Sequence, residues 1–111
     1  MQQPSPTSGD TILRPEEEIT SYFWVLSDPL RYRILKMLYE KPMNVQEIAD
    51  DLNRQGEKLT RQAVTNALGV LKDYDFVNYE REGKTHTYKV NQQIIDEIVL
   101  IMRLSFRVKA S

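Results

Sequence analysis

The residues best suited to chemistry in this sequence are polar side chains on one face of a predicted helix. The segment from Thr60 to Lys72 carries apolar residues at helical spacing, at Val64, Leu68 and Leu71. Burial of that stripe leaves the outer face to four polar residues and a glycine: Arg61, Gln62, Thr65, Asn66 and Gly69. Arginine pairs with guanine, glutamine or asparagine with adenine, and threonine with a base or the thymine methyl group. These residue types indicate contacts with base edges in a DNA major groove.

Gly69 adds a second reason to expect a partner on this face. A glycine weakens a helix interior by roughly 1 kcal/mol relative to alanine. Close approach of the helix backbone to an outside molecule would explain why the position carries no side chain. The alternative is that this polar face only contacts solvent, as exposed polar faces of helices usually do.

A second group of residues is suited to phosphates rather than to bases: Arg54, Lys58, Thr60, Arg81 and Lys84. The amide groups at the start of the Thr60 helix favour an anion at that end. Contacts of this kind supply affinity and register but little sequence information. For the two basic residues of the hairpin the alternative is a charged tip that serves solubility alone.

These residues are positioned by a series of predicted helices that begins at Asp28. The first helix reads DPLRYRILKML, with Asp28 as cap and Pro29 at its first position. The second reads NVQEIADDL and is capped by Asn44, and the third is capped by Thr60. A polar connector lies between Leu52 and Leu59.

A β-hairpin, VNYEREGKTHTYKV, is predicted after the third helix. Glu82-Gly83 is the expected two-residue turn, because glycine adopts the positive φ that such turns need. That turn pairs Arg81 with Lys84, Tyr79 with His86 and Val77 with Tyr88. The inner face then holds Val77, Tyr79, His86, Tyr88 and Val90, so a structural role is expected for His86, the single histidine.

Two apolar helices are expected outside this region, one starting near Pro15 and one running from Asn91 to about Val108. Their apolar stripes are wider than one side of a small domain requires. We interpret them as a subunit interface formed by Ile19, Phe23, Ile95, Ile98, Val99, Met102 and Phe106. The alternative for the last helix is burial in the core. Residues 1–13 are expected to form a flexible arm, and residues 14–111 the domain.

Composition narrows the functional class. The chain has 111 residues, a net charge of −1 and no cysteine, which excludes disulfides and thiolate metal sites. From Arg54 to Lys89 there are seven basic and five acidic side chains, so this region is locally basic. No membrane span, signal peptide or catalytic motif is apparent. We therefore expect a cytoplasmic protein without enzymatic activity, cofactor or metal.

From Leu26 to Asn91 the chain resembles the ArsR-type winged-helix repressors of bacteria and archaea. LSDPLRYRILKML is similar to the opening helix of that family, NVQEIADDL and LTRQAVTNALGVLKDYDFV to its helix-turn-helix, and REGKTHTYKVN to its wing. MarR-like regulators have a similar pattern. The resemblance implies a homodimer built from the first and last helices that binds a near-palindromic operator and represses transcription. It also implies base contacts by Gln62, Thr65 and Asn66, with Arg61 beside them, and backbone contacts by the wing.

The chain departs from this family at three places. NVQEIADDL lacks the cysteine motif of the metal-sensing members, and Asp96 and Glu97 do not supply the histidines of the other metal site of the family. The resemblance is therefore to members that do not sense metals. The connector between Leu52 and Leu59 is also longer than the usual tight turn.

The sequence thus predicts a mainly α protein with a small β-hairpin, a winged helix-turn-helix with additional terminal helices. The expected function is sequence-specific binding of double-stranded DNA by a homodimeric transcription regulator. One alternative is a protein–protein assembly module that uses the apolar terminal helices, and another is RNA binding. The sequence does not indicate the operator, the regulated genes or an effector.

Overall fold

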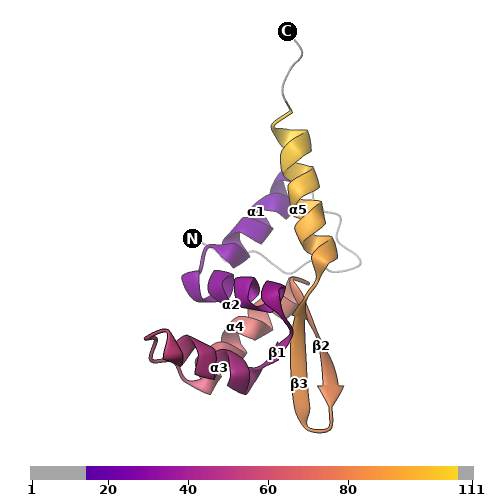
Figure 1. Cartoon of the computed structure of the whole chain (residues 1–111). Helices are drawn as coiled ribbons and strands as arrows, with labels where there is room; N and C mark the ends of the chain where they lie inside the picture. The colour runs from indigo at the N-terminus through magenta and orange to yellow at the C-terminus, as the bar shows by residue number, and fades with distance from the viewer. Residues whose placement is uncertain (1–14, 108–111) are drawn as a thin grey trace.

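The computed structural model describes residues 15–107, so the expected arm over residues 1–13 lies outside the described part. The described chain folds into five helices and three short strands (Figure 1). In chain order the elements are α1 (Pro15–Leu26), α2 (Pro29–Glu40), β1 (Met43–Asn44), α3 (Val45–Arg54), α4 (Arg61–Asp73), β2 (Val77–Glu82), β3 (Thr85–Val90) and α5 (Gln92–Ser105). This order confirms the predicted fold class.

The helix starts follow from local capping. Asp28 accepts a hydrogen bond from the Arg31 amide at 3.0 Å, and Pro29 occupies the first turn of α2. Asn44 and Glu47 form a reciprocal capping box at the start of α3. The Thr60 hydroxyl accepts a hydrogen bond from the Ala63 amide at 3.1 Å, which fixes where α4 begins. All three predicted caps are confirmed.

The core lies where the apolar stripes of α2, α3 and α4 meet the base of the hairpin. Its fully buried side chains are Val25, Ile34, Ile48, Leu52, Val64, Leu68, Leu71, Phe76 and Val77. Val64, Leu68 and Leu71 are the apolar positions that the sequence predicted for α4. Because their burial fixes the rotation of the helix, the opposite face of α4 has to point to solvent.

The three strands form an antiparallel sheet in the order β1-β3-β2. Strand β1 was not predicted; it is only two residues long, and its Met43 pairs with Tyr88 of β3. The sequence gives no sign of such a strand, because two residues carry no periodicity.

The predicted register of the hairpin is wrong by two residues. The turn is Gly83-Lys84, not Glu82-Gly83, and Gly83 adopts a φ of +62°. Glu82 therefore pairs with Thr85, Arg81 with His86, Tyr79 with Tyr88 and Val77 with Val90. A shift of two residues leaves each side chain on its predicted face. Only Val77 on that face is fully buried.

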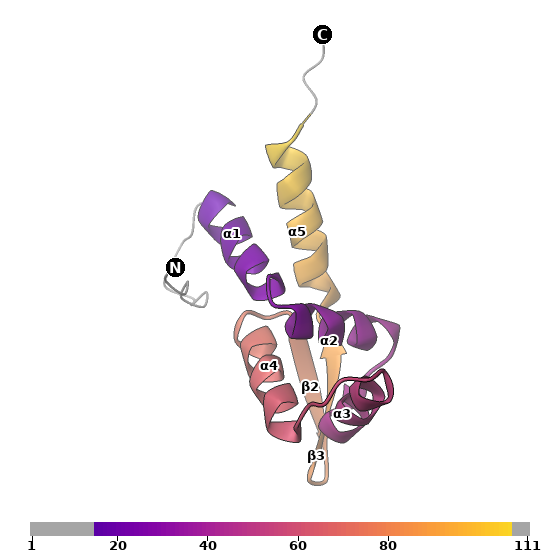
Figure 2. The same cartoon turned by 90° about the vertical axis from the view of Figure 1, so that its left-hand side faces the viewer.

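Helices α1 and α5 lie together on the side of the molecule opposite the hairpin tip (Figures 1 and 2). The Tyr22 hydroxyl joins them, since it donates to Glu18 of α1 at 3.0 Å and also contacts Glu97 of α5 at 3.5 Å. Burial and the two carboxylates raise the pKa of Tyr22 well above its ordinary value. Helix α5 ends at Ser105, a few residues before the predicted end near Val108.

Candidate nucleic-acid interface

The outer face of α4 carries the residues that the sequence analysis assigned to base contacts. Arg61, Gln62, Thr65, Asn66 and Gly69 are all exposed, opposite the buried stripe of the same helix. The first four lie in its N-terminal half, which is the part of a recognition helix that contacts bases. A Cβ atom added at Gly69 would meet no atom within 4 Å, so nothing in the described structure requires a glycine there.

The side chains of Gln62 and Asn66 form a hydrogen bond with each other. The Gln62 Nε2 atom donates to Asn66 Oδ1 at 2.8 Å, across one turn of the helix. Side chains four residues apart are neighbours on a helix surface, and amide pairs of this kind hold each other in place. Both residues were predicted to contact bases, but their interaction with each other was not predicted.

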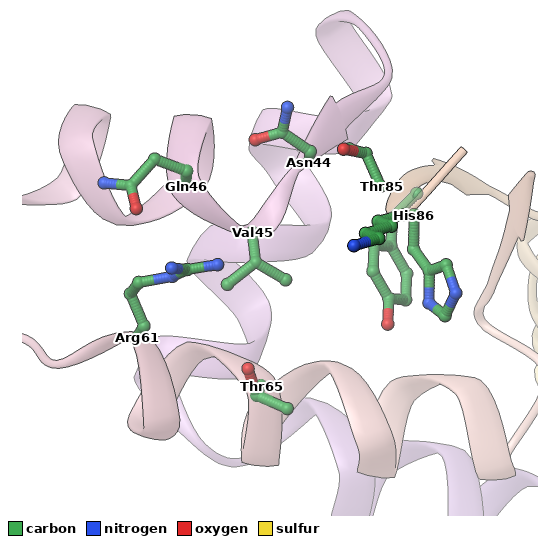
Figure 3. Close-up of a pocket in the computed structure, with 9 residues that line it drawn as sticks. Asn44, Val45, Gln46, Arg61, Thr65, Thr85 and His86 are labelled. Atoms are coloured by element: carbon green, nitrogen blue, oxygen red, sulfur yellow. The ribbon is translucent and has the colours of Figure 1, made fainter. Parts of the chain in front are cut away.

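A cleft of about 280 Å³ opens between α3, α4 and the hairpin. Its lining comes from the start of α3, the first turns of α4 and the hairpin near its tip: Asn44, Val45, Gln46, Arg61, Thr65, Lys84, Thr85, His86 and Tyr88. Figure 3 shows Arg61 and Thr65 rising from α4, with Thr85 and His86 on the other side of Val45. The fold therefore places the predicted recognition helix and the predicted wing on the two sides of one concave surface.

The predicted phosphate contacts fall into two groups. Within residues 15–107, the predicted phosphate contacts Lys58 and Lys84 form no ion pair, and neither does Arg61, which was predicted to contact bases. The charges of these three side chains are therefore available to an anion. Arg54 is paired with Asp51 of its own helix at 3.1 Å. The Arg81 Nε atom donates to the Gly83 carbonyl at 2.9 Å and thus supports the hairpin turn.

His86 and its neighbours form a stack on the hairpin. The His86 ring lies 4.3 Å from the Tyr79 ring at an interplanar angle of 18°, and Lys72 of α4 lies 5.2 Å from the Tyr79 centroid. His86 is half-buried and lines the cleft, whereas the sequence analysis placed it among apolar neighbours. The difference arises because the hairpin extends beyond the core near its tip, so the Tyr79 ring on which His86 stacks is itself exposed.

Asn44, Gln46 and Thr85 also line the cleft but were not predicted as site residues. The cleft joins segments that are far apart in sequence, and no local pattern indicates that they meet.

The long connector before α4 is ordered by side chains. Asn53 donates from Nδ2 to the Leu59 carbonyl at 3.2 Å and accepts from the Leu59 amide through Oδ1 at 2.9 Å. Glu57 forms an ion pair with Arg33 of α2. Gly56 adopts a φ of +96°, which a side chain would disfavour. The extra length therefore forms a defined turn that fixes the chain just before Thr60.

The residues predicted for a subunit interface lie on α1 and α5, except Phe106, which directly follows α5. Phe23, Val99, Met102 and Phe106 are exposed, and Ile19 and Ile95 are half-buried. Ile98 is not available to a partner, because it is buried within the chain itself and belongs to the core. Leu100 and Leu104 were not assigned to the interface, yet they are 56% and 64% exposed; their spacing of four residues is the signal that could have found them.

Within residues 15–107, no group of three or more histidine or acidic side chains is arranged to hold a metal ion. None of the helices in this range combines the length and the apolar character needed to cross a bilayer.

Comparisons with known proteins agree with the fold described above. Residues 26–80 match the family model described as a helix-turn-helix domain. Comparison with curated protein sequences gives no match.

Several solved structures share the fold over most of the chain. An ArsR-like transcriptional regulator from Rhodococcus sp. RHA1 is 22% identical, with 81% of each chain covered and a TM-score of 0.67. HlyU from Vibrio cholerae is also 22% identical, with 84% of this chain and 97% of that chain covered and a TM-score of 0.66. Rv0081 from Mycobacterium tuberculosis is 27% identical, with 87% and 100% covered and a TM-score of 0.59.

Proposed function

With a helix-turn-helix domain at residues 26–80 and the fold of ArsR-like winged-helix regulators, the chain is a winged-helix protein, and we propose that it is a sequence-specific DNA-binding transcription regulator. In this proposal α4 enters the major groove and the wing, Val77–Val90, contacts the backbone. Base contacts are made by Arg61, Gln62, Thr65 and Asn66, with the DNA passing close to Gly69. Backbone contacts are made by Arg54, Lys58, Thr60, Arg81 and Lys84.

One observation supports this proposal most strongly. The exposed polar face of α4 borders a concave cleft whose opposite wall is the hairpin. Arg61 and Lys84 line that cleft, and neither forms an ion pair with another residue of the described range 15–107. A duplex needs a protruding helix for its groove and cations beside it for its phosphates. Both are present here on one side of the molecule. A surface of this kind gives affinity that falls as salt rises, because phosphate contacts release counterions.

The exposed apolar residues of α1 and α5 support a homodimer. Phe23 of α1, Val99 and Met102 of α5, and Phe106 directly after α5 are exposed apolar side chains. Helices α1 and α5 lie on the side opposite the hairpin tip (Figure 1). Pairing of two chains through this surface would leave both recognition helices free. A symmetric dimer reads a near-palindromic operator whose half-sites lie about one helical turn apart. Occupation of such an operator next to a promoter would repress transcription.

The proposal is tested by binding to DNA from the promoter region of its own gene over a salt series. We expect specific binding that weakens steeply with salt, and a loss of about fivefold or more for Arg61→Ala or Asn66→Ala. Lys36→Ala on α2 is the matched control, since it removes one exposed positive charge away from the cleft. No binding at low salt, or equal effects of Arg61→Ala and Lys36→Ala, would contradict the proposal.

The second candidate function is protein–protein assembly through the terminal helices. The exposed apolar surface on α5 favours it as much as it favours a homodimer. The two functions differ in what the α4 face does. If the chain is an assembly module, substitutions at Arg61 and Asn66 leave its interactions unchanged, and it binds no promoter DNA.

A further inference from the structure

The hydrogen bond between Gln62 and Asn66 restricts what these two side chains can recognise. Both are exposed on the face of α4 opposite the buried Val64 and Leu68, and both lie in the N-terminal half of the helix. Their amide groups are joined by the 2.8 Å bond from Gln62 Nε2 to Asn66 Oδ1. The two side chains therefore reach solvent as one unit rather than as two independent amides.

The hydrogen bond between the two side chains leaves one carbonyl oxygen and one amino group of the pair unused. With Gln62 Nε2 bonded to Asn66 Oδ1, the Gln62 carbonyl and the Asn66 amino group have no hydrogen-bond partner among residues 15–107. Turning both amides around reverses the bond but leaves the same set, one carbonyl and one amino group. The recognition chemistry of the pair is thus independent of the orientation of the two amides.

Adenine matches the unbonded carbonyl and amino group of this pair in the major groove. Adenine presents an acceptor at N7 and a donor at N6, guanine presents two acceptors, cytosine one donor and thymine one acceptor. We propose that Gln62 and Asn66 read a single adenine jointly, as a hydrogen-bonded pair, in each half-site. The inference rests on the proposed function, and it adds the identity of a base and the residues that select it.

The bond also explains why the two residues should act together. A free glutamine loses side-chain freedom when it binds a base, whereas a side chain already held by its neighbour loses less. Removal of either residue releases the other, so each single substitution should abolish most of the recognition. Two independent contacts would instead lose affinity in an additive way.

The experiment begins with selection of binding sites from a random double-stranded DNA library by the full chain. We expect the selected half-site to contain an adenine at which 7-deazaadenine, which lacks N7, or purine, which lacks the N6 amino group, costs about fivefold or more in affinity. Gln62→Ala, Asn66→Ala and the double variant should each show a similar loss and should bind the two analogues as well as they bind adenine.

Gln92→Ala is the matched control. Gln92 makes the same type of contact on α5, where its Nε2 atom donates to Asp96 at 3.1 Å, and its loss should leave DNA affinity unchanged. Circular dichroism checks that the variants fold, as expected for exposed positions.

The outcomes separate this inference from the function on which it rests. A selected site without an adenine that responds to both analogues, or strictly additive losses for the two substitutions, would overturn the joint reading while leaving DNA binding intact. A library from which nothing is enriched would overturn the proposed function and the joint reading with it.

Discussion

Asn53 holds Leu59 by two hydrogen bonds across the turn that precedes the recognition helix. The Asn53 Nδ2 atom donates to the Leu59 carbonyl at 3.2 Å, and its Oδ1 atom accepts from the Leu59 amide at 2.9 Å. Leu59 adjoins Thr60, whose hydroxyl caps α4. One side chain at the end of α3 thus holds the residue directly before the cap of α4, a contact that the sequence of a long polar connector did not reveal.

The first prediction concerns the two hydrogen bonds between Asn53 and Leu59. Asn53→Ala removes both hydrogen bonds, and we expect it to lower the free energy of unfolding by about 1 kcal/mol, because each bond is exposed. DNA affinity should fall by more than the stability loss explains, since the start of α4 becomes less fixed. Urea denaturation and DNA titration measure the two effects. Asn53→Asp keeps the acceptor and loses the donor, so its unfolding free energy and its DNA affinity should lie between those of the wild type and of Asn53→Ala. Unchanged DNA affinity in both variants would exclude a positioning role for Asn53.

The second prediction concerns Gly69. Gly69→Ala should raise the free energy of unfolding by roughly 0.5–1 kcal/mol, because alanine is the better helix former and its Cβ meets no neighbour. The same change should weaken DNA binding severalfold if DNA approaches the helix backbone there. Thermal unfolding and a binding assay on one preparation test both effects. A more stable variant with unchanged affinity would show that no close approach occurs.

The third prediction concerns the exposed apolar surface of α5. Val99→Glu places a charge in the proposed interface, which should convert a dimer into a monomer and weaken operator binding, because a monomer holds one half-site. Light scattering at micromolar concentration reports the mass. Tyr39→Glu is the matched control, since Tyr39 is an exposed residue of α2 outside that surface. A wild-type chain that is monomeric would contradict the dimer.

The fourth prediction concerns pH. Burial and the carboxylates of Glu18 and Glu97 raise the pKa of Tyr22 in the folded chain. The folded state therefore favours the protonated phenol, and this contribution to stability is complete below the unfolded pKa of about 10 and declines as pH rises above it. Tyr22→Phe removes the ionisable group. The loss of stability above about pH 10 should be smaller in Tyr22→Phe than in the wild type.

Chemical denaturation at pH 7, 9 and 10.5 measures the Tyr22 contribution. The gap in unfolding free energy between the two proteins should be constant at the lower two values and should narrow at the highest. A gap that stays the same at all three values would show that Tyr22 does not carry the effect.

Local patterns predicted the parts of this protein that depend on neighbours in sequence. The caps at Asp28, Asn44 and Thr60 and the buried stripe of α4 are contacts within one or two helical turns, so the sequence alone indicates them. The hairpin was found, but its register was missed by two residues. A glycine at either central position of a two-residue turn satisfies the same rule, and only the pairing of the strands decides between them.

The sequence by itself determined the order of the helices and the hairpin and which face of α4 is polar, because apolar spacing fixes what a helix buries. The tertiary structure decided what depends on segments far apart in the chain. It placed Lys84 of the hairpin and Arg61 of α4 on one cleft, it buried Ile98 in the core instead of leaving it to a partner, and it extended the sheet with β1. These features arise from packing between elements, and no local pattern encodes which surfaces meet.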